Sequence, residues 1–308
     1  MRHDLVARLR KYADLVVTAT AVTVPELVSR WSVETLTTRS AGSQKDISYC
    51  IPNLTEFFSN PSPAPLEAVR PVHISQYLDW RKAAPVRANR EIAWLSVAWN
   101  WARSRGLTDL PNPCGGVRRN RETGRDIYVE DEEFDAIHAE ADVPLQEFMD
   151  LAYLIGQRPG DLRSLENAAA SGEALRIQQS KTGAKLRVAI EGHLAELLEK
   201  IAQRKDAMRA RGKVVSGSLI VDENGQPMTK DKMRYRFDKA RKAAISKHPE
   251  RAERIAQIQL RDIRAKSGSD KREAEGLDAA QGLLGHRRAD MTEHYTRQRR
   301  GKLVKPVD

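Results

Sequence analysis

Three short segments in the second half of the chain carry residues whose types suit chemistry on an anionic ester. They span 156–162 (GQRPGDL), 260–266 (LRDIRAK) and 283–296, where LLGH is followed closely by TEHYT. An arginine carries a permanent charge on a planar fork that fits two phosphate oxygens, and a tyrosine hydroxyl can act as a covalent nucleophile. Each segment alone has a plain structural explanation as a solvated turn or a packed side chain. Their order and spacing must therefore be judged together.

The elements that position these residues follow from the apolar pattern. Leu175–Gln179 and Leu186–Ile190 alternate apolar and polar residues around a turn at Ser180–Gly183, which predicts a β-hairpin with Lys181 in its turn. The acidic cluster Glu130–Glu133 is compatible with a metal site. A helix start explains it better, because acidic residues in a first turn complement the helix dipole. The rest of this half is expected to be helical.

Taken together, the segments closely resemble the tyrosine recombinases of the phage-integrase kind. That family has a Gly-x-Arg-x-x-Glu-Leu box, a lysine on a β-hairpin, a His-x-x-Arg box, and Leu-Gly-His with a tyrosine nine residues after the histidine. The positions that match here are Arg158, Lys181, Arg264, His286 and Tyr295. The resemblance covers the second half closely and the first half loosely. It implies a mainly α protein of two domains, a helical core-binding domain and an α+β catalytic domain with a small antiparallel sheet, as in type IB topoisomerases.

The resemblance also implies a mechanism. Tyr295 attacks the phosphorus and forms a 3′-phosphotyrosine link, while Arg158 and Arg264 clamp the nonbridging oxygens as their charge develops. His286 adds a donor to these oxygens, and Lys181 protonates the 5′-hydroxyl leaving group as general acid. The link retains an activated ester, so rejoining is expected to need no ATP, no metal and no other cofactor. The sequence accordingly has no Walker-type glycine loop and no HExxH motif.

Two positions depart from the family pattern. Asp161 stands where glutamate is usual, a conservative change for a residue that supports the first arginine. Arg261 stands at the histidine position of the second box. A guanidinium group does not release its proton near neutral pH, so we expect Arg261 to hold a phosphate oxygen and not to transfer protons.

Composition limits the partner and the compartment. The 308 residues include 52 lysines and arginines against 42 acidic residues, a net charge of +10 that favours a polyanionic partner. No apolar run approaches the roughly 20 residues that a membrane span needs, and the first residues lack the apolar core of a secretion signal. Cys50 and Cys114 lie far apart without metal-ligand spacing. We therefore expect free thiols, no membrane, and the cytoplasm of a bacterium or of a phage's bacterial host.

The first half of the chain reads as helices. A capping threonine and an early proline predict a helix start at Val24–Val28, and Asn60–Pro65 reads as a loop. Two amphipathic helices begin near Val72 and Ala88, and the second stops at Gly106. The expected core positions of that helix recur at helical spacing: Ile92, Leu95, Trp99 and Ala102.

A basic, polar stretch without apolar periodicity follows the break at 111–116. A segment that crosses a phosphate backbone would use this charge, although an ordinary solvated linker remains an alternative. We expect an N-terminal extension at 1–22, the helical DNA-binding domain at 23–117, a basic linker at 118–127 and the catalytic domain at 128–308. The residues expected to contact DNA are Lys82, Arg87, Arg90, Arg118, Arg119, Arg121, Arg125, Lys230, Lys232, Arg234, Arg236 and Lys239.

The favoured function is a site-specific recombinase that integrates or excises a mobile element in double-stranded DNA. Strand exchange implies other copies of the chain, as a tetramer on paired sites, and an accessory DNA-bending protein is a further expected partner. Two alternatives remain open. A type IB topoisomerase-like enzyme would relax DNA without exchanging strands, and a non-catalytic regulator of the same fold would bind DNA without cutting it.

Overall fold

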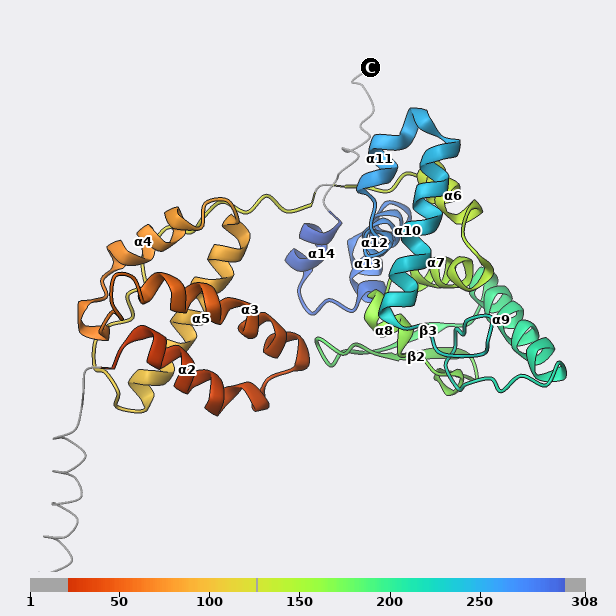
Figure 1. Cartoon of the computed structure of the whole chain (residues 1–308). Helices are drawn as coiled ribbons and strands as arrows, with labels where there is room; N and C mark the ends of the chain where they lie inside the picture. The colour runs from red at the N-terminus through yellow and green to blue at the C-terminus, as the bar shows by residue number, and fades with distance from the viewer. Residues whose placement is uncertain (1–21, 126, 297–308) are drawn as a thin grey trace, which may run out of the picture. The chain divides into compact units, whose positions relative to one another are not determined.

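The structure is a computed structural model that describes residues 22–125 and 127–296 (Figure 1). The chain divides into two compact units, Met1–Gly124 and Arg125–Asp308. The division falls inside the stretch that the sequence suggests as linker. The expected N-terminal extension lies outside the described residues, apart from Val22.

The first unit is helical, as the sequence predicts. The Thr23 side chain accepts a hydrogen bond from the Glu26 amide at 3.4 Å and caps the first helix, which has proline at its second position. The last helix is followed by Gly106, whose φ of 69° favours glycine. The helices are α2 (Val24–Thr35), η1 (Leu36–Thr38), α3 (Ala41–Phe58), η2 (Leu66–Ala68), α4 (Pro71–Trp80) and α5 (Pro85–Ser104).

The core of the first unit forms where α2, α3, α4 and α5 meet. The four core positions predicted for α5 are fully buried, which confirms the helical spacing read from the sequence: Ile92, Leu95, Trp99 and Ala102. Trp31 of α2 is buried in the same core. The two cysteines are also buried, and both are free thiols, as predicted.

The second unit combines helices with a small sheet (Figure 1). Strands β1 (Ala170–Ser171), β2 (Ala174–Gln178) and β3 (Lys185–Ala189) pair antiparallel in the order β1-β2-β3. The predicted hairpin is therefore confirmed, with β1 as an unpredicted third strand. The helices are α6 (Asp131–Ala139), α7 (Val143–Ile155), α8 (Pro159–Arg163), η3 (Asn167–Ala169), α9 (Gly192–Ala210), α10 (Lys230–Lys247), η4 (Pro249–Arg251), α11 (Ala252–Gln257), α12 (Asp262–Glu275), α13 (Leu277–Leu284) and α14 (Ala289–Tyr295).

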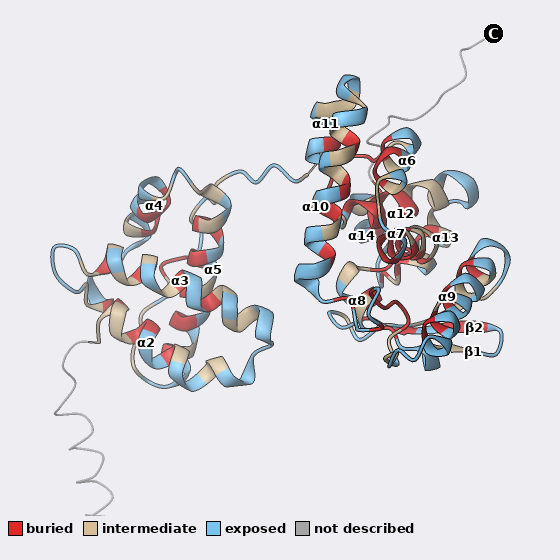
Figure 2. Ribbon diagram, turned by 45° about the vertical axis from the view of Figure 1, so that its right-hand side comes forward, coloured by how far each residue is buried: buried red, intermediate tan, exposed pale blue. Residues whose placement is uncertain are grey.

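Helix α12 lies at the centre of the second unit and packs against α7, α13 and α14. Figure 2 shows the buried residues concentrated around α7, α12 and α13, with exposed turns on the outer sides of α9 and α10. Gly268 allows α13 to approach, because a Cβ atom there would lie 2.7 Å from Leu284 Cδ1. Elements distant in sequence are thereby brought against one helix.

The acidic cluster at the start of α6 is structural, as predicted. Glu130 is the N-cap, and its amide donates to Glu133 Oε2 at 3.0 Å in a capping box. Glu133 is buried and paired with Arg254. Across residues 22–125 and 127–296, no three His, Cys, Asp or Glu side chains gather as a metal ligand set, and no helix is long and apolar enough to span a membrane.

Candidate active site

Arg158 is positioned by a tight turn between α7 and α8. Helix α7 ends at Gly156, which has a φ of 59°, and a Cβ atom there would lie 2.9 Å from Ser267 Oγ. Both facts favour glycine, the first because this backbone region disfavours side chains. Arg158 then takes an extended conformation as the N-cap of α8. Its side chain is about one quarter exposed, at 26%, so its guanidinium can reach a ligand.

Arg264 is held inside the unit by backbone carbonyls from two turns. Its Nη1 donates to the Gly156 carbonyl at 2.7 Å, and its Nη2 donates to the Leu284 carbonyl at 2.8 Å. The side chain is buried, and burial lowers its pKa to about 10, with a further lowering from the nearby Arg158. Arg264 therefore remains a cation at neutral pH. Its charge is fixed in place before any ligand arrives.

His286 follows a second left-handed turn, at the end of α13. Gly285 has a φ of 64°, and His286 directly after it is buried. His286 Nε2 lies 3.1 Å from Arg264 Nη2, and His286 Nδ1 lies 3.1 Å from Thr292 Oγ1. Burial lowers the pKa of His286 to about 4, and the charges of Arg264 and Arg158 act in the same direction. The imidazole is therefore neutral at pH 7.

Tyr295 is the last residue of α14 and lies against both groups. Its ring makes an edge-to-face contact with His286 at a centroid distance of 5.5 Å. The centre of the Arg264 guanidinium lies 5.4 Å from the centroid of the same ring. Thr292, one turn earlier in α14, is buried and bonded to His286. The structure thus brings three of the candidate residues, from α12, the turn after α13, and α14, into one contact cluster.

Lys181 lies where the sequence places it, on the exposed hairpin turn. Among the described residues it makes no hydrogen bond or ion pair, whereas its neighbour Ser180 is firmly held. The Ser180 amide and hydroxyl donate to Asp161 Oδ1 at 2.9 and 2.6 Å. Asp161 is buried, and its other carboxylate oxygen lies 3.7 Å from Arg158 Nη1. The predicted supporting residue therefore links the first arginine to the turn that carries the lysine.

Arg261 is exposed and lines a basic hollow of about 550 Å³ whose lining includes neither Arg264, His286 nor Tyr295. Within the described part of the chain, it makes no hydrogen bond to Arg158, Arg264 or His286. The hollow lies between α8, α10 and the start of α12, and its basic lining residues are Arg163, Lys230, Arg234, Arg241 and Arg261. Arg261 thus precedes Arg264 by three residues in the sequence and lines the same hollow as α8. Its charged group is accessible to solvent.

Sequence reasoning missed two buried amides, Gln157 and Gln179. Gln157 precedes Arg158, and Gln179 is the last residue before the hairpin turn. Both side chains are buried and hydrogen bonded to each other at 2.8 Å. The only signal in the sequence was that each sits inside a segment already singled out, because an isolated glutamine has no periodicity or motif of its own.

The predicted DNA-contact residues divide by their protein partners. Several already form internal ion pairs: Arg87 with Asp46, Arg125 with Asp262, Lys232 with Asp222, Arg234 with Asp238, and Arg236 with Asp142 and Glu223. Arg119 is half-buried. The exposed ones are Lys82, Arg90, Arg118, Arg121, Lys230, Lys232, Arg234 and Lys239, of which Lys232 and Arg234 are also ion-paired. The charges of the exposed side chains are the more accessible to a ligand. Contact with DNA remains a prediction for all of these residues.

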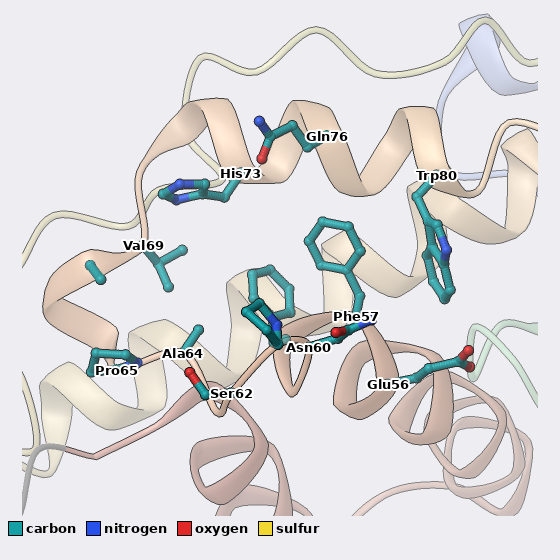
Figure 3. Close-up of a pocket in the computed structure, with 13 residues that line it drawn as sticks. Glu56, Phe57, Asn60, Ser62, Ala64, Pro65, Val69, His73, Gln76 and Trp80 are labelled. Atoms are coloured by element: carbon teal, nitrogen blue, oxygen red, sulfur yellow. The ribbon is translucent and has the colours of Figure 1, made fainter.

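A further hollow of about 500 Å³ lies in the first unit, between α4 and the end of α3 (Figure 3). Phe57 and Trp80 wall it, and His73 and Glu56 lie at its edge. The His73 ring is engaged in capping α4, since its Nδ1 accepts from the Arg70 amide at 3.0 Å. None of the candidate catalytic residues lines this hollow.

A mainly helical unit with a three-stranded antiparallel sheet, in which arginine, histidine and tyrosine meet, is the architecture of a tyrosine recombinase. The sequence model described as "Phage integrase family" matches residues 128–301, more than half of the chain, and the protein belongs to this family. The family resemblance seen in the sequence and the predicted fold class are thereby confirmed.

Two curated relatives are phage integrases. The integrase of Escherichia phage HK022 is 30% identical over 197 residues, which cover 62% of this chain and 52% of that protein. The integrase of Enterobacteria phage 434 is 28% identical over 250 residues, covering 78% of this chain and 66% of that protein. The chain therefore spans between about half and two thirds of the length of these relatives.

Solved structures share the fold. A lambda integrase tetramer bound to a Holliday junction superposes with a TM-score of 0.74 at 21% identity, covering 96% of this chain and 83% of that one. The Tn1549 transposon integrase in complex with transposon right end DNA gives a TM-score of 0.73 at 14% identity, covering 89% and 94%. At these identities the likeness concerns the fold alone.

Proposed function

We propose that this protein is a site-specific recombinase that cuts and rejoins duplex DNA through a 3′-phosphotyrosine intermediate on Tyr295. The observation that carries the proposal is the contact of the Tyr295 ring with both Arg264 and His286. A nucleophile beside a fixed cation is suited to attack on an anionic phosphorus, because the cation stabilises negative charge as it develops. Family membership supports the same conclusion.

The proposed steps assign one task to each group. Arg158 and Arg264 donate to the nonbridging oxygens of the scissile phosphate, and Arg261 donates from the accessible basic hollow. Tyr295 releases its phenolic proton to solvent, and its oxygen attacks the phosphorus and displaces the 5′-oxygen, to which Lys181 on its exposed turn delivers a proton. The buried Nε–H of Arg264 has no partner among the described residues and is a further available donor. Rejoining reverses the attack with a 5′-hydroxyl from another strand, so no ATP and no metal is consumed.

The proposed partners follow from strand exchange. Two duplex sites are cut and rejoined, which requires several copies of the chain, and we propose a tetramer on paired sites. The related lambda integrase forms a tetramer on a Holliday junction, which supports this assembly. We place the reaction in the bacterial cytoplasm, because the relatives belong to phages of enteric bacteria. We also propose an accessory DNA-bending protein as a further partner. The basic linker and the exposed cations would hold the duplex.

The test is capture of the covalent intermediate. The substrate is a duplex with a nick just 3′ of the cleavage position. After cutting, the short fragment between the cut and the nick is lost, and its 5′-hydroxyl is no longer present for rejoining. The protein therefore stays attached to the DNA. Wild type should give a denaturation-resistant adduct in EDTA, and Tyr295→Phe should bind DNA equally but give none. The control is Tyr235→Phe, which alters an exposed tyrosine that is 71% accessible.

Persistent adducts with Tyr295→Phe would reject the nucleophile. Activity lost in EDTA and restored by magnesium would instead indicate a metal-dependent nuclease. Strand exchange between two sites separates a recombinase from a topoisomerase-like enzyme, which would relax supercoils without exchanging partners.

A further inference from the structure

The side chain of Gln179 joins three separate parts of the candidate active site. Its Oε1 accepts from Arg158 Nη1 at 3.1 Å and from Thr182 Oγ1 at 2.7 Å. Its Nε2 donates to Gln157 Oε1 and to the Leu284 carbonyl, both at 2.8 Å. An amide has two donor hydrogens and two acceptor lone pairs, so the hydrogen-bonding capacity of Gln179 is fully used.

Gln157 extends the same network to the second arginine. Its Nε2 donates to the Ile155 carbonyl at 2.9 Å and to the Leu283 carbonyl at 2.7 Å. Its Oε1 accepts from Gln179 and, more weakly at 3.5 Å, from Arg264 Nη1. The two buried amides therefore form one connected unit between both arginines.

The turn that leads to His286 is built against this unit. A Cβ atom on Gly285 would lie 2.8 Å from Gln179 Nε2, closer than real Cβ atoms approach. The turn can come this near only because Gly285 has no side chain. A shift of the Gln179 amide would therefore displace the turn before His286 as well as the hairpin turn.

We propose that Gln179 is a positioning residue that sets the Lys181 turn in register with the two arginines. This inference rests on the proposed function. The Thr182 hydroxyl, directly after Lys181, and the Arg158 guanidinium share one acceptor oxygen on Gln179. That oxygen thus fixes the lysine turn relative to the phosphate-binding arginine. The paired donors on Nε2 hold the amide itself in place, because its plane cannot rotate without losing both bonds.

The chemistry requires an amide at this position. A carboxylate could still accept from Arg158 and Thr182, but it would face the Leu284 carbonyl without a donor and would bind Arg158 more strongly. An apolar side chain of similar length would fill the space and keep none of the bonds. Gln179→Met therefore removes all four of these hydrogen bonds, whereas Gln179→Glu removes only the two that Nε2 donates.

The experiment compares single-turnover cleavage of two substrates by the full chain, one with the natural 5′-oxygen bridge and one with sulfur in its place. A thiolate leaves without protonation, so the sulfur substrate does not need a general acid. The matched control is Gln178→Met, the same change at the exposed neighbouring residue on β2. Melting temperature and DNA affinity are measured for every variant.

We expect Gln179→Met to cleave the oxygen substrate about 10- to 100-fold more slowly than wild type, since small misplacements of catalytic groups have effects of this order. On the sulfur substrate the loss should be smaller by several-fold, because the lysine is no longer needed. Gln179→Glu should likewise show the larger loss on oxygen, since it lacks the donors that hold the amide. Gln178→Met should match wild type on both substrates.

Equal losses on both substrates would overturn the inference, because a merely structural role affects them alike. Oxygen-substrate rates for Gln179→Met equal to those of Gln178→Met would overturn it too. If wild type and Gln178→Met form no covalent adduct, the proposed function itself fails. Adduct formation by both, with no substrate-dependent effect in Gln179→Met, leaves the function standing and removes only the positioning role.

Discussion

His286 Nε2 accepts a hydrogen bond from Arg264 Nη2 across 3.1 Å. The direction is fixed because a guanidinium can only donate. The single proton of the neutral imidazole therefore lies on Nδ1, which donates to Thr292 Oγ1. In the free protein His286 is thus a neutral acceptor that orients Arg264, and it can donate to a phosphate only after it gains a proton or turns.

This relationship predicts the titration of His286. Burial and two neighbouring arginines lower its pKa to about 4, so its NMR midpoint in the free protein should lie near that value. Bound DNA should raise the midpoint, because a phosphate favours the imidazolium form. The measurement uses non-cleaving Tyr295→Phe with and without duplex, and His286→Gln assigns the signal. A midpoint near 6.5 in the free protein would show that the imidazole is not buried against Arg264.

The same shift has a consequence for stability. The folded-state pKa lies below the usual 6.5, so the folded protein binds fewer protons than the unfolded chain between pH 6.5 and pH 4. The contribution of neutral His286 to the free energy of unfolding is therefore complete above about pH 6.5. It is lost as the pH falls through about 4. It amounts to at most roughly 3 kcal/mol. Chemical unfolding of wild type and His286→Gln across this range measures it as their difference.

Lys181→Ala tests the general acid. The variant should cleave ordinary DNA slowly, by roughly 100-fold or more, and should cleave a substrate with a sulfur-bridged leaving group near the wild-type rate. Arg264→Ala should be slow on both substrates, since its proposed contact is with the nonbridging oxygens. The control is Lys185→Ala, at the exposed start of β3. If sulfur rescues Lys185→Ala and not Lys181→Ala, the acid is Lys185.

Arg261 is tested by two substitutions. Arg261→Ala should slow single-turnover cleavage roughly 10- to 100-fold, the effect of losing about 1.5–3 kcal/mol from a hydrogen bond to a charged group. Arg261→His should retain most of the activity, because histidine is usual at this position in the family. Arg211→Ala, at an exposed arginine that ends α9, controls for net charge. Full-rate cleavage by Arg261→Ala would place this side chain outside the phosphate-binding set.

Gly183 and Gly285 have similar φ values but different surroundings. Substituting each in turn therefore distinguishes the energetic cost of backbone strain from the cost of close packing. Gly183 has a φ of 69° with open space around a Cβ atom, whereas Gly285 has a φ of 64° and would place its Cβ atom 2.8 Å from Gln179 Nε2. Gly183→Ala should lower the unfolding free energy by about 1–2 kcal/mol, from the left-handed backbone alone. Gly285→Ala should cost a further 1–3 kcal/mol or so, because the packed turn must shift. Equal losses in chemical unfolding would show that the turn tolerates a side chain.

Much of the local structure was predictable because its causes are local. The helix start at Thr23, the core stripe of α5 and the β2–β3 hairpin follow from capping, periodicity and alternation, which depend on neighbours in the sequence. The short strand β1 was missed because two residues carry no alternation. The order and spacing of the motif residues likewise identified the family from sequence alone, and the match over 128–301 confirms it.

The sequence by itself indicated which residues we propose as phosphate-binding cations, nucleophile and proton donor, and it placed Lys181 on the hairpin turn. Tertiary structure alone decided that Arg264 is buried on the carbonyls of Gly156 and Leu284, and that His286 is neutral beside it. It also placed Arg261 in a separate basic hollow. These outcomes depend on contacts between α7, α12 and α13, elements that lie more than 100 residues apart at their extremes. Burial and hydrogen-bond partners arise only when such elements meet, so no local pattern encodes them.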